Sequence, residues 1–317
     1  MTSHHVPDKQ APATLQELSP ISWTELIDPL DADVSRVASM AGFDEKFIYD
    51  ALDLHERPRI EVDDETTLLV IRAPHALIVD GAMRYSTIPI GVLLSQSTLV
   101  VVCKLKDGPL VDILRKSKFK TQRPRAESAI CSIVKDIALL FMHYLKDISA
   151  KIQEVERELA DSPSNDDLTL LLNLQKSVTY FHAALKTNDF IIDRIIRKGL
   201  SVGCSTKLAF TEDEIDTLDD ALTDFRQGIY MSKIFNEVLD SISNVYSSII
   251  SNNLNQVMKI LTSFTVILMI PTLITSTYGM NIPLPFQGQE RAFLLVAVAT
   301  VCLTVAVVLL LKKKKIL

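Results

Sequence analysis

Two long apolar segments stand close together near the C-terminal end of this 317-residue chain. The segment Ala292–Leu311 contains twenty residues and no charge. A helix of that length rises about 30 Å, the thickness of the hydrocarbon core of a bilayer. The earlier segment, Val257–Tyr278, carries only Lys259, close to one end. Because the connection between the two segments is short, the sequence predicts a transmembrane hairpin.

Apolar residues before this hairpin repeat at three-and-four spacing, which is typical of helices packed against other helices. The repeating positions are Ile215, Leu218, Leu222, Phe225 and Ile229, followed by Phe235, Val238, Ile242, Val245 and Ile249. A capping box, Thr211-x-x-Glu214, begins the pattern, and Pro271 should at most kink a membrane helix. We therefore expect one continuous helix from Thr211 to Tyr278, a stalk that runs on into the first span.

The rest of the chain divides into an α/β part and a helical part. Short β-rich runs at 66–71, 88–94 and 98–103 predict strands, and the segments 32–40, 45–52 and 110–116 predict helices. After Arg123-Pro124, two helices are expected at 126–160 and about 167–198, the second ending at Gly199. The predicted fold is an α+β cytosolic domain followed by a long stalk helix and two transmembrane helices, mostly α overall. The expected divisions are a disordered terminus (1–12), an α/β domain (13–122), a helical domain with stalk (123–256), a first span (257–281), an external loop (282–291), a second span (292–311) and a basic tail (312–317).

Charge orients the predicted hairpin. The net charge of −6 is the sum of +5 from Met258 onward and −11 over the preceding residues, which hold 38 acids and 27 bases. Clustered lysines stay in the cytoplasm, so Lys312–Lys315 place the C-terminus there, and two spans return the N-terminus to the same side. The polar segment Met1–Pro12 does not have the apolar core of a signal peptide. We expect a multi-pass protein of the cell (inner or plasma) membrane, in contact with the lipid bilayer.

Familiar catalytic motifs are missing from the sequence. There is no GxSxG and no HExxH, and Gly199-x-x-x-Gly203 has neither the spacing nor the Lys-Ser/Thr of a phosphate-binding loop. The four cysteines are too scattered for a disulfide scaffold or a CxxC metal site. Apart from the pair at His4-His5, the histidines have no metal-ligand spacing. The sequence therefore predicts no enzyme, no nucleotide cofactor and no nucleic-acid partner.

A polar stripe follows one face of the first span. Its members recur at steps of three and four: Asn255, Met258, Thr262, Thr265, Met269, Thr272, Ser276 and Gly279. One interpretation is hydrogen bonding by Ser and Thr between membrane helices. The other is that identical helices gather around an axis and line a pore with this face. The second span offers only Thr300, Cys302 and Thr304, so it would be the outer, lipid-facing helix.

The first span ends in Tyr278-Gly279-Met280-Asn281, and with this motif the chain resembles the CorA family of magnesium transporters. Further resemblance lies in Asn255-x-x-Met258-Lys259-x-Leu261-Thr262, in Lys312–Lys315 at the end, and upstream in Arg57-Pro58-Arg59-Ile60-Glu61. The resemblance implies a homopentamer, with five first spans forming the pore above a cytosolic funnel. It also implies that Tyr278 and Gly279-Met280-Asn281 form the selectivity motif, and that Asn255, Met258, Leu261 and Met269 line or constrict the pore.

The residue chemistry agrees with these implied roles. Mg²⁺ prefers oxygen ligands and releases its water reluctantly, so a ring of Asn281 carbonyls can accept hydrogen bonds from a hydrated ion. Gly279 should let the backbone turn and approach closely. Met258, Leu261 and Met269 suit constrictions that gate by dewetting. The negative membrane potential contributes about 4.6 kcal/mol per 100 mV to the entry of a divalent cation, so no nucleotide is needed.

The resemblance further implies that intracellular Mg²⁺ binds between neighbouring subunits and closes the pore. Alignment on the motif suggests Asp219 and Asp220 on the stalk, with Asp80 on the α/β side, as regulatory ligands. One departure is the external loop, which holds a single acid, Glu290, beside Arg291. Uptake of Mg²⁺ through a gated channel is the leading hypothesis. A Zn²⁺ or Co²⁺/Ni²⁺ transporter on the same scaffold, and a non-conducting membrane-anchored scaffold or signalling protein, are the alternatives.

Overall fold

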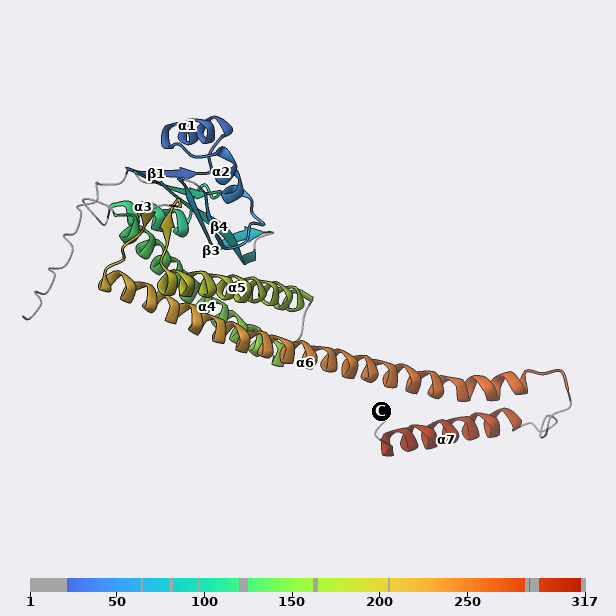
Figure 1. Ribbon diagram of the computed structural model, residues 1–317. Helices are drawn as coiled ribbons and strands as arrows, with labels where there is room; N and C mark the ends of the chain where they lie inside the picture. Colours follow the sequence, from blue (N-terminus) through green and yellow to red (C-terminus); the bar gives the residue numbers. More distant parts are fainter. Residues whose placement is uncertain are drawn as a thin grey trace, which may run out of the picture. The chain divides into compact units, whose positions relative to one another are not determined.

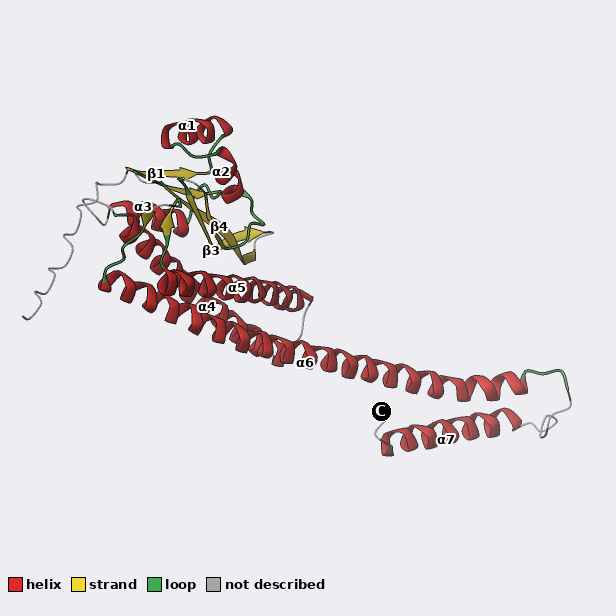
Figure 2. Ribbon diagram, in the orientation of Figure 1, coloured by secondary structure: helices red, strands yellow, loops and turns green. Residues whose placement is uncertain are grey.

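The computed structural model describes residues 22–63, 65–79, 82–95, 97–119, 125–161, 165–204, 206–282, 285 and 291–314. These residues fall into two compact units, divided between Asp240 and Ser241. The terminus predicted at 1–12, the turn with Asp80 and most of the predicted loop at 282–291 lie outside the described residues. The chain is mostly helical, as predicted (Figure 2).

A five-stranded sheet forms the centre of the first unit. Its strands are β1 (Ser22–Ile27), β2 (Arg59–Val62), β3 (Thr67–Val79), β4 (Ala82–Leu94) and β5 (Thr98–Cys103). The spatial order is β1-β5-β4-β3-β2, with β1 parallel to β5 and the other neighbours antiparallel. The three predicted strands are confirmed. The edge strands β1 and β2 were not predicted, because both are short and rich in polar residues and neither contains a long apolar run.

Helices cover both faces of this sheet (Figure 1). On one face, α1 (Asp31–Ala41) and α2 (Glu45–Leu52) form a buried cluster with the strand residues Leu68 and Val70. On the other face lie α3 (Pro109–Phe119), α4 (Ala126–Asp161) and α5 (Asn165–Lys198). Consecutive residues 67–71 of β3 are therefore all buried, which explains the continuous apolar run in the sequence.

The hairpin of β3 and β4 continues beyond its neighbours as a two-stranded ribbon, and the sequence did not predict this extension. The pairing of β2 with β3 stops at Val70, and the pairing of β5 with β4 stops at Ile90. The pairing of β3 with β4 continues to Val79 and Ala82. The backbone N–H of Arg72 faces away from β4, toward α5. Because alternate residues point the same way, Pro74 also turns its nitrogen to this open edge, where no ladder hydrogen bond is lost.

A single helix, α6 (Glu212–Tyr278), follows two short strands, β6 (Ser201–Val202) and β7 (Thr206–Lys207). The predicted capping box is present: the Glu214 N–H donates to Thr211 Oγ1 at 3.3 Å, and the Thr211 N–H donates to Glu214 Oε2 at 2.8 Å. In the first unit, α6 buries Leu218, Leu222 and Phe225. The apolar spacing predicted there is therefore explained by packing within the chain itself.

Gly228 allows α6 to pass close to two neighbouring helices. A Cβ atom at this position would lie 3.1 Å from Leu185 Cδ1 on α5 and 3.3 Å from Leu145 Cδ1 on α4. Phe141 of α4 links the same region, with its ring centroid 5.2 Å from that of Phe181 and 6.3 Å from that of Phe225. The first half of α6 is thus held by an apolar core that includes all three helices.

The second unit contains the rest of α6 and helix α7 (Ala292–Lys313). Both are long and apolar enough to cross a membrane, and only 6% and 0% of their most apolar stretches are buried. Helix α4 is also apolar enough over Ala126–Arg157, but 67% of that stretch is buried in the protein. The apolar surface of α4 is therefore used for the core, whereas that of α6 and α7 remains bare.

Candidate ion pathway

The eight residues predicted to line a pore all lie on the part of α6 in the second unit, and all are exposed. They are Asn255, Met258, Leu261, Thr262, Thr265, Met269, Thr272 and Ser276. Their spacing places them on one face of the helix. We call these eight residues the polar face of α6.

The part of the polar face from Thr265 to Ser276 borders a shallow groove of about 510 Å³. The groove is lined by Thr265, Leu268, Met269, Thr272, Leu273 and Ser276. Hydroxyl groups alternate there with aliphatic and thioether side chains, and no side chain in the lining carries a charge. A hydrated cation passing this surface would meet polar oxygens without being held by a carboxylate.

Two hydroxyl groups of this face, those of Thr265 and Thr272, point their hydrogens toward the backbone of α6. Thr265 Oγ1 donates to the Leu261 carbonyl at 2.9 Å, and Thr272 Oγ1 donates to the Leu268 carbonyl at 2.8 Å. Each hydroxyl hydrogen is thus occupied by the backbone of the same helix, and the oxygen lone pairs remain as acceptors. Water molecules around a cation point their hydrogens outward, so acceptors are the groups that complement them.

The opposite face of α6 is the one that is covered. The least exposed residues of α6 between 255 and 282 are Ser263, Ile267, Ile270, Pro271 and Ile274. At 100° per residue, their stripe lies roughly 160° around the helix axis from the polar face. Helix α7 is the other described helix of this unit, and its least exposed residues also form a stripe, at Val296, Ala297, Thr300, Thr304, Val307, Val308 and Leu311. The polar face of α6 is therefore turned away from α7.

The motif begins at the last residue of α6, Tyr278, and continues into the turn that follows the helix. The Gly279 N–H donates to the Thr275 carbonyl at 2.9 Å, and the Met280 N–H donates to the Thr277 carbonyl at 3.3 Å. The Tyr278 hydroxyl donates to the carbonyl of Pro285 at 3.4 Å and so ties the motif to the connection that follows. Met280 is 50% exposed, and Asn281 is exposed as well.

Gly279 lies in the turn directly after the last residue of α6, and its backbone does not adopt the left-handed conformation that favours glycine. Among the glycines that the structure describes, Gly42, Gly108, Gly199 and Gly203 have a positive φ, and Gly279 does not. A Cβ atom at Gly279 would lie 3.4 Å from the carbonyl oxygens of Thr275 and Ser276, which is close to ordinary contact. Among the described residues of one copy, no contact therefore requires glycine at this position.

The three predicted regulatory acids are not brought together by a single copy of the chain. Asp219 and Asp220 are exposed on α6 in the first unit, and neither pairs with a described residue. Asp80 lies outside the described residues. Within the described part of the chain, no group of three or more His, Cys, Asp and Glu side chains is arranged to hold a metal ion.

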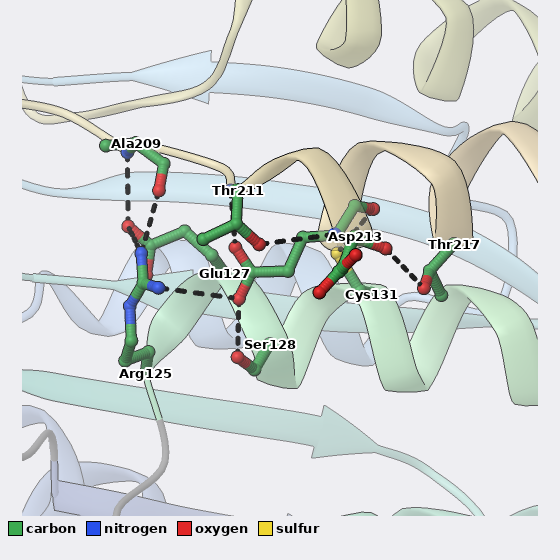
Figure 3. Close-up of polar contacts among 9 residues, drawn as sticks. Arg125, Glu127, Ser128, Cys131, Ala209, Thr211, Asp213 and Thr217 are labelled. Carbon is green, nitrogen blue, oxygen red and sulfur yellow. Dashed lines mark hydrogen bonds and ion pairs between the residues drawn. The ribbon is translucent and has the colours of Figure 1, made fainter.

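Sequence reasoning missed a polar cluster that fixes the start of α6 on the start of α4 (Figure 3). Arg125 Nη2 donates to the Ala209 carbonyl at 2.7 Å, and the Ala209 N–H donates to Glu127 Oε1 at 3.1 Å. Glu127 is only 1% exposed and also lies 3.5 Å from the Arg125 guanidinium. Ser128 Oγ donates to Glu214 Oε1 at 2.5 Å. The local sequence does not indicate that Glu127 is buried. Its burial depends on contacts with Ala209, which is distant in the sequence.

Cys131 lies in the same cluster, with its Sγ 3.5 Å from the Glu214 carbonyl oxygen. Burial, together with the nearby carboxylates Glu214 and Glu127, raises the pKa of this thiol to about 12. The thiol is thus kept protonated and unreactive. The cluster has the character of a structural anchor for α6 and not of a reactive site.

Known protein sequences match this chain over nearly its whole length. The sequence profile of a family described as CorA-like Mg²⁺ transporter protein matches residues 19–313. A cobalt/magnesium transport protein CorA from Methanocaldococcus jannaschii is 26% identical over 279 residues, which cover 86% of this chain and 84% of that protein. A protein of the same name from Thermotoga maritima is 21% identical over 315 residues, covering 97% of this chain and 87% of the relative.

The fold is similar to that of a solved structure. The complete structure of the CorA magnesium transporter from Methanocaldococcus jannaschii superposes with a TM-score of 0.73 at 25% sequence identity. The superposition covers 92% of this chain and 89% of that one. The soluble α/β domain, the long helix and the terminal helix are therefore shared.

Proposed function

Since this chain belongs to the CorA-like Mg²⁺ transporter family, we propose that it conducts divalent cations, above all Mg²⁺, into the cell along the polar face of α6. The family is a class of membrane ion transporters and not a known class of enzyme. A divalent cation entering a cell with a negative interior gains about 4.6 kcal/mol per 100 mV. Entry down this gradient would need no nucleotide.

The observation that carries this proposal is the orientation of the polar face. The hydroxyl hydrogens of Thr265 and Thr272 are bonded to backbone carbonyls, their oxygens are left as acceptors, and the face is turned away from α7. If Thr265 and Thr272 served only to join α6 to α7, they would belong to the covered stripe with Ser263. Their place on the opposite face supports the interpretation that several copies of α6 surround one axis.

In the proposed assembly, five copies of the chain form a funnel, with α6 inside and α7 outside. Residues 257–281 and 292–311 would be the two spans, joined by an external loop at 282–291. The α/β domain at 13–122, the helical domain at 123–256 and the tail at 312–317 would lie in the cytoplasm. If five chains approach one another closely at the mouth, a side chain at position 279 would collide with a neighbouring copy, which would explain the glycine.

The selectivity that we propose follows from hard oxygen chemistry. Tyr278, Gly279, Met280 and Asn281 would form the outer mouth, where the Asn281 carbonyl accepts hydrogen bonds from the ion's water shell. The polar face contains neither Cys nor His, which argues against selection of soft metals. A pore for hydrated ions is permissive, however, and both relatives described above carry cobalt as well as magnesium in their names. Co²⁺ is therefore the second candidate ion, ahead of Ni²⁺ and Zn²⁺.

We also propose that intracellular Mg²⁺ closes the pore by binding near Asp219 and Asp220, with Asp80 of a neighbouring copy as a further ligand. Both stalk carboxylates are exposed and have no described partner, so they are available to an ion that a second copy helps to hold. Neutralising both as Asp219→Asn and Asp220→Asn should weaken inhibition by internal Mg²⁺. Unchanged inhibition would remove these two residues from the sensor.

Conduction is tested by divalent cation flux into vesicles that contain the purified full-length protein. Mg²⁺, Co²⁺, Ni²⁺ and Zn²⁺ are compared side by side, with and without a proton gradient. Asn281→Ala should abolish most of the Mg²⁺ flux, whereas Thr300→Ala on the α7 stripe serves as the control and should conduct normally. Equal flux in wild type and Asn281→Ala would favour a non-conducting membrane-anchored protein.

A further inference from the structure

Each of the two facing stripes in the second unit ends in a lysine. On α6, Lys259 lies one turn before Ser263 and on the same face, because residues four apart share a helix face. On α7, Lys314 follows Val307 and Leu311 at steps of four and three and so continues the covered stripe. Both lysines are exposed, in contrast to Ser263, which is only 1% exposed.

Lys259 on α6 and Lys312 on α7 also lie at the same level of the hairpin. Lys259 is nineteen residues before Tyr278, and Lys312 is twenty residues after Ala292. At 1.5 Å per residue, each is about 30 Å from the end of its helix at the connection. Lys312, Lys313 and Lys314 are all exposed. We call Lys259 together with these three residues the lysine cluster.

No acidic residue of the second unit neutralises this cluster. In the sequence from Ser241 onward, the sole acid is Glu290, thirty-one residues after Lys259. The preceding acid on α6 is Asp240, nineteen residues before Lys259. Like charges gathered at one level repel each other unless an anion lies between them. Ser263 adds a hydroxyl whose Oγ has no hydrogen-bond partner among the described residues.

The surroundings of the cluster are those of a membrane surface. Val257 is 60% exposed, Leu309 61% and Leu310 58%, so bare apolar side chains lie directly beside the lysine stems. Asn252, Asn253 and Gln256 precede Lys259 and are also exposed, which supplies amide donors on the side away from the apolar stretch. A ligand for this place needs an anionic head and an apolar body.

We propose that the lysine cluster binds the headgroup of an anionic phospholipid at the open end of the α6–α7 hairpin. The phosphate would lie between Lys259 and Lys314, and the acyl chains would run along the exposed aliphatic residues of both helices. This inference rests on the proposed membrane location of the hairpin, but not on conduction. Basic residues at a membrane surface each strengthen anionic lipid binding by about fivefold.

The test uses the purified full-length protein with phosphatidylglycerol or phosphatidylcholine as the probe lipid. Native mass spectrometry counts the retained lipid, and thermal unfolding reports stabilisation. Wild type should retain phosphatidylglycerol and unfold at a higher temperature with it, whereas phosphatidylcholine should have little effect. Lys259→Gln should weaken phosphatidylglycerol binding about fivefold, and Lys312→Gln, Lys313→Gln and Lys314→Gln together about a hundredfold.

The matched control is Lys233→Gln, an exposed lysine on the part of α6 in the first unit, which should bind phosphatidylglycerol like wild type. Equal retention in wild type and the cluster variants would overturn the proposal, and so would equal stabilisation by inorganic phosphate, which would indicate a free-anion site. Circular dichroism confirms that each variant is folded. Because flux is not the readout, a protein that binds phosphatidylglycerol but conducts no Mg²⁺ would contradict the proposed function alone.

Discussion

Asn188 on α5 forms both of its side-chain hydrogen bonds with the backbone of one residue, Arg72 on β3. The Arg72 N–H donates to Asn188 Oδ1 at 3.0 Å, and Asn188 Nδ2 donates to the Arg72 carbonyl at 2.7 Å. The amide thus takes the place of a strand neighbour at the point where β2 has ended. On the other strand of the ribbon, Ser177 Oγ accepts from the Tyr85 N–H at 3.3 Å. Helix α5 therefore holds both strands of the β3–β4 ribbon.

Asn188→Ala should destabilise the protein. The side chain is 0% exposed, and its removal leaves the backbone groups of Arg72 buried without partners, at a cost of about 1–3 kcal/mol. Thermal or denaturant unfolding of the full-length protein measures the loss. The control is Thr179→Ala, an exposed threonine that bonds only within its own helix, which should change stability by less than about 0.5 kcal/mol. Equal effects of the two changes would contradict this assignment.

Strand β4 lies so close to α2 at Gly91 that only glycine fits at this position. An added Cβ would lie 2.3 Å from the Ala51 Cβ, so Gly91→Ala forces the strand and helix apart and should cost about 1–3 kcal/mol. Adding Ala51→Gly removes the opposing atom and should recover part of the stability. Unfolding of the two single variants and the double variant gives the coupling energy. Strict additivity would mean that the contact is not the cause.

The cysteines should differ in reactivity. Burial raises the pKa of Cys103 to about 11 and that of Cys131 to about 12, so almost no thiolate exists near neutral pH. Cys204 is exposed in the turn between β6 and β7. Brief alkylation with iodoacetamide at about pH 8, followed by peptide mass spectrometry, should modify Cys204 and leave the other two unmodified. Denaturant should abolish the difference, and labelling of Cys131 in the folded protein would contradict its placement.

Replacing Thr265 and Thr272, whose hydroxyls donate to the backbone of α6, tests whether the polar face acts as the proposed acceptor surface. Thr265→Val with Thr272→Val preserves the shape of the side chains but removes both oxygens. If each contributes a hydrogen bond of about 0.5–1.5 kcal/mol to the passing hydrated ion, Mg²⁺ flux should fall by at least about fivefold. Thr300→Val with Thr304→Val on α7 is the matched control and should conduct like wild type. Flux in vesicles measures both pairs, and an equal loss would place all four threonines in helix packing.

Local patterns were sufficient to predict the helices of this protein. The capping box at Thr211 and Glu214 and the uninterrupted apolar periodicity predicted α6, because these signals depend on residues three or four apart. The twenty-residue run in α7 was equally clear. The same local logic failed for β1 and β2, whose polar residues are tolerated because each strand lies at an edge of the sheet. It also failed for the ribbon beyond Ile71, because Asn188 and Ser177 complete it from another helix.

For the candidate site, the sequence by itself determined which residues of α6 share a face, since helical periodicity follows from the chain alone. Only the tertiary structure decided that this face is turned away from α7. It likewise decided that Glu127 is buried and that Lys259 and Lys314 end facing stripes. These properties depend on which helix lies against which, and such contacts join residues far apart in the sequence.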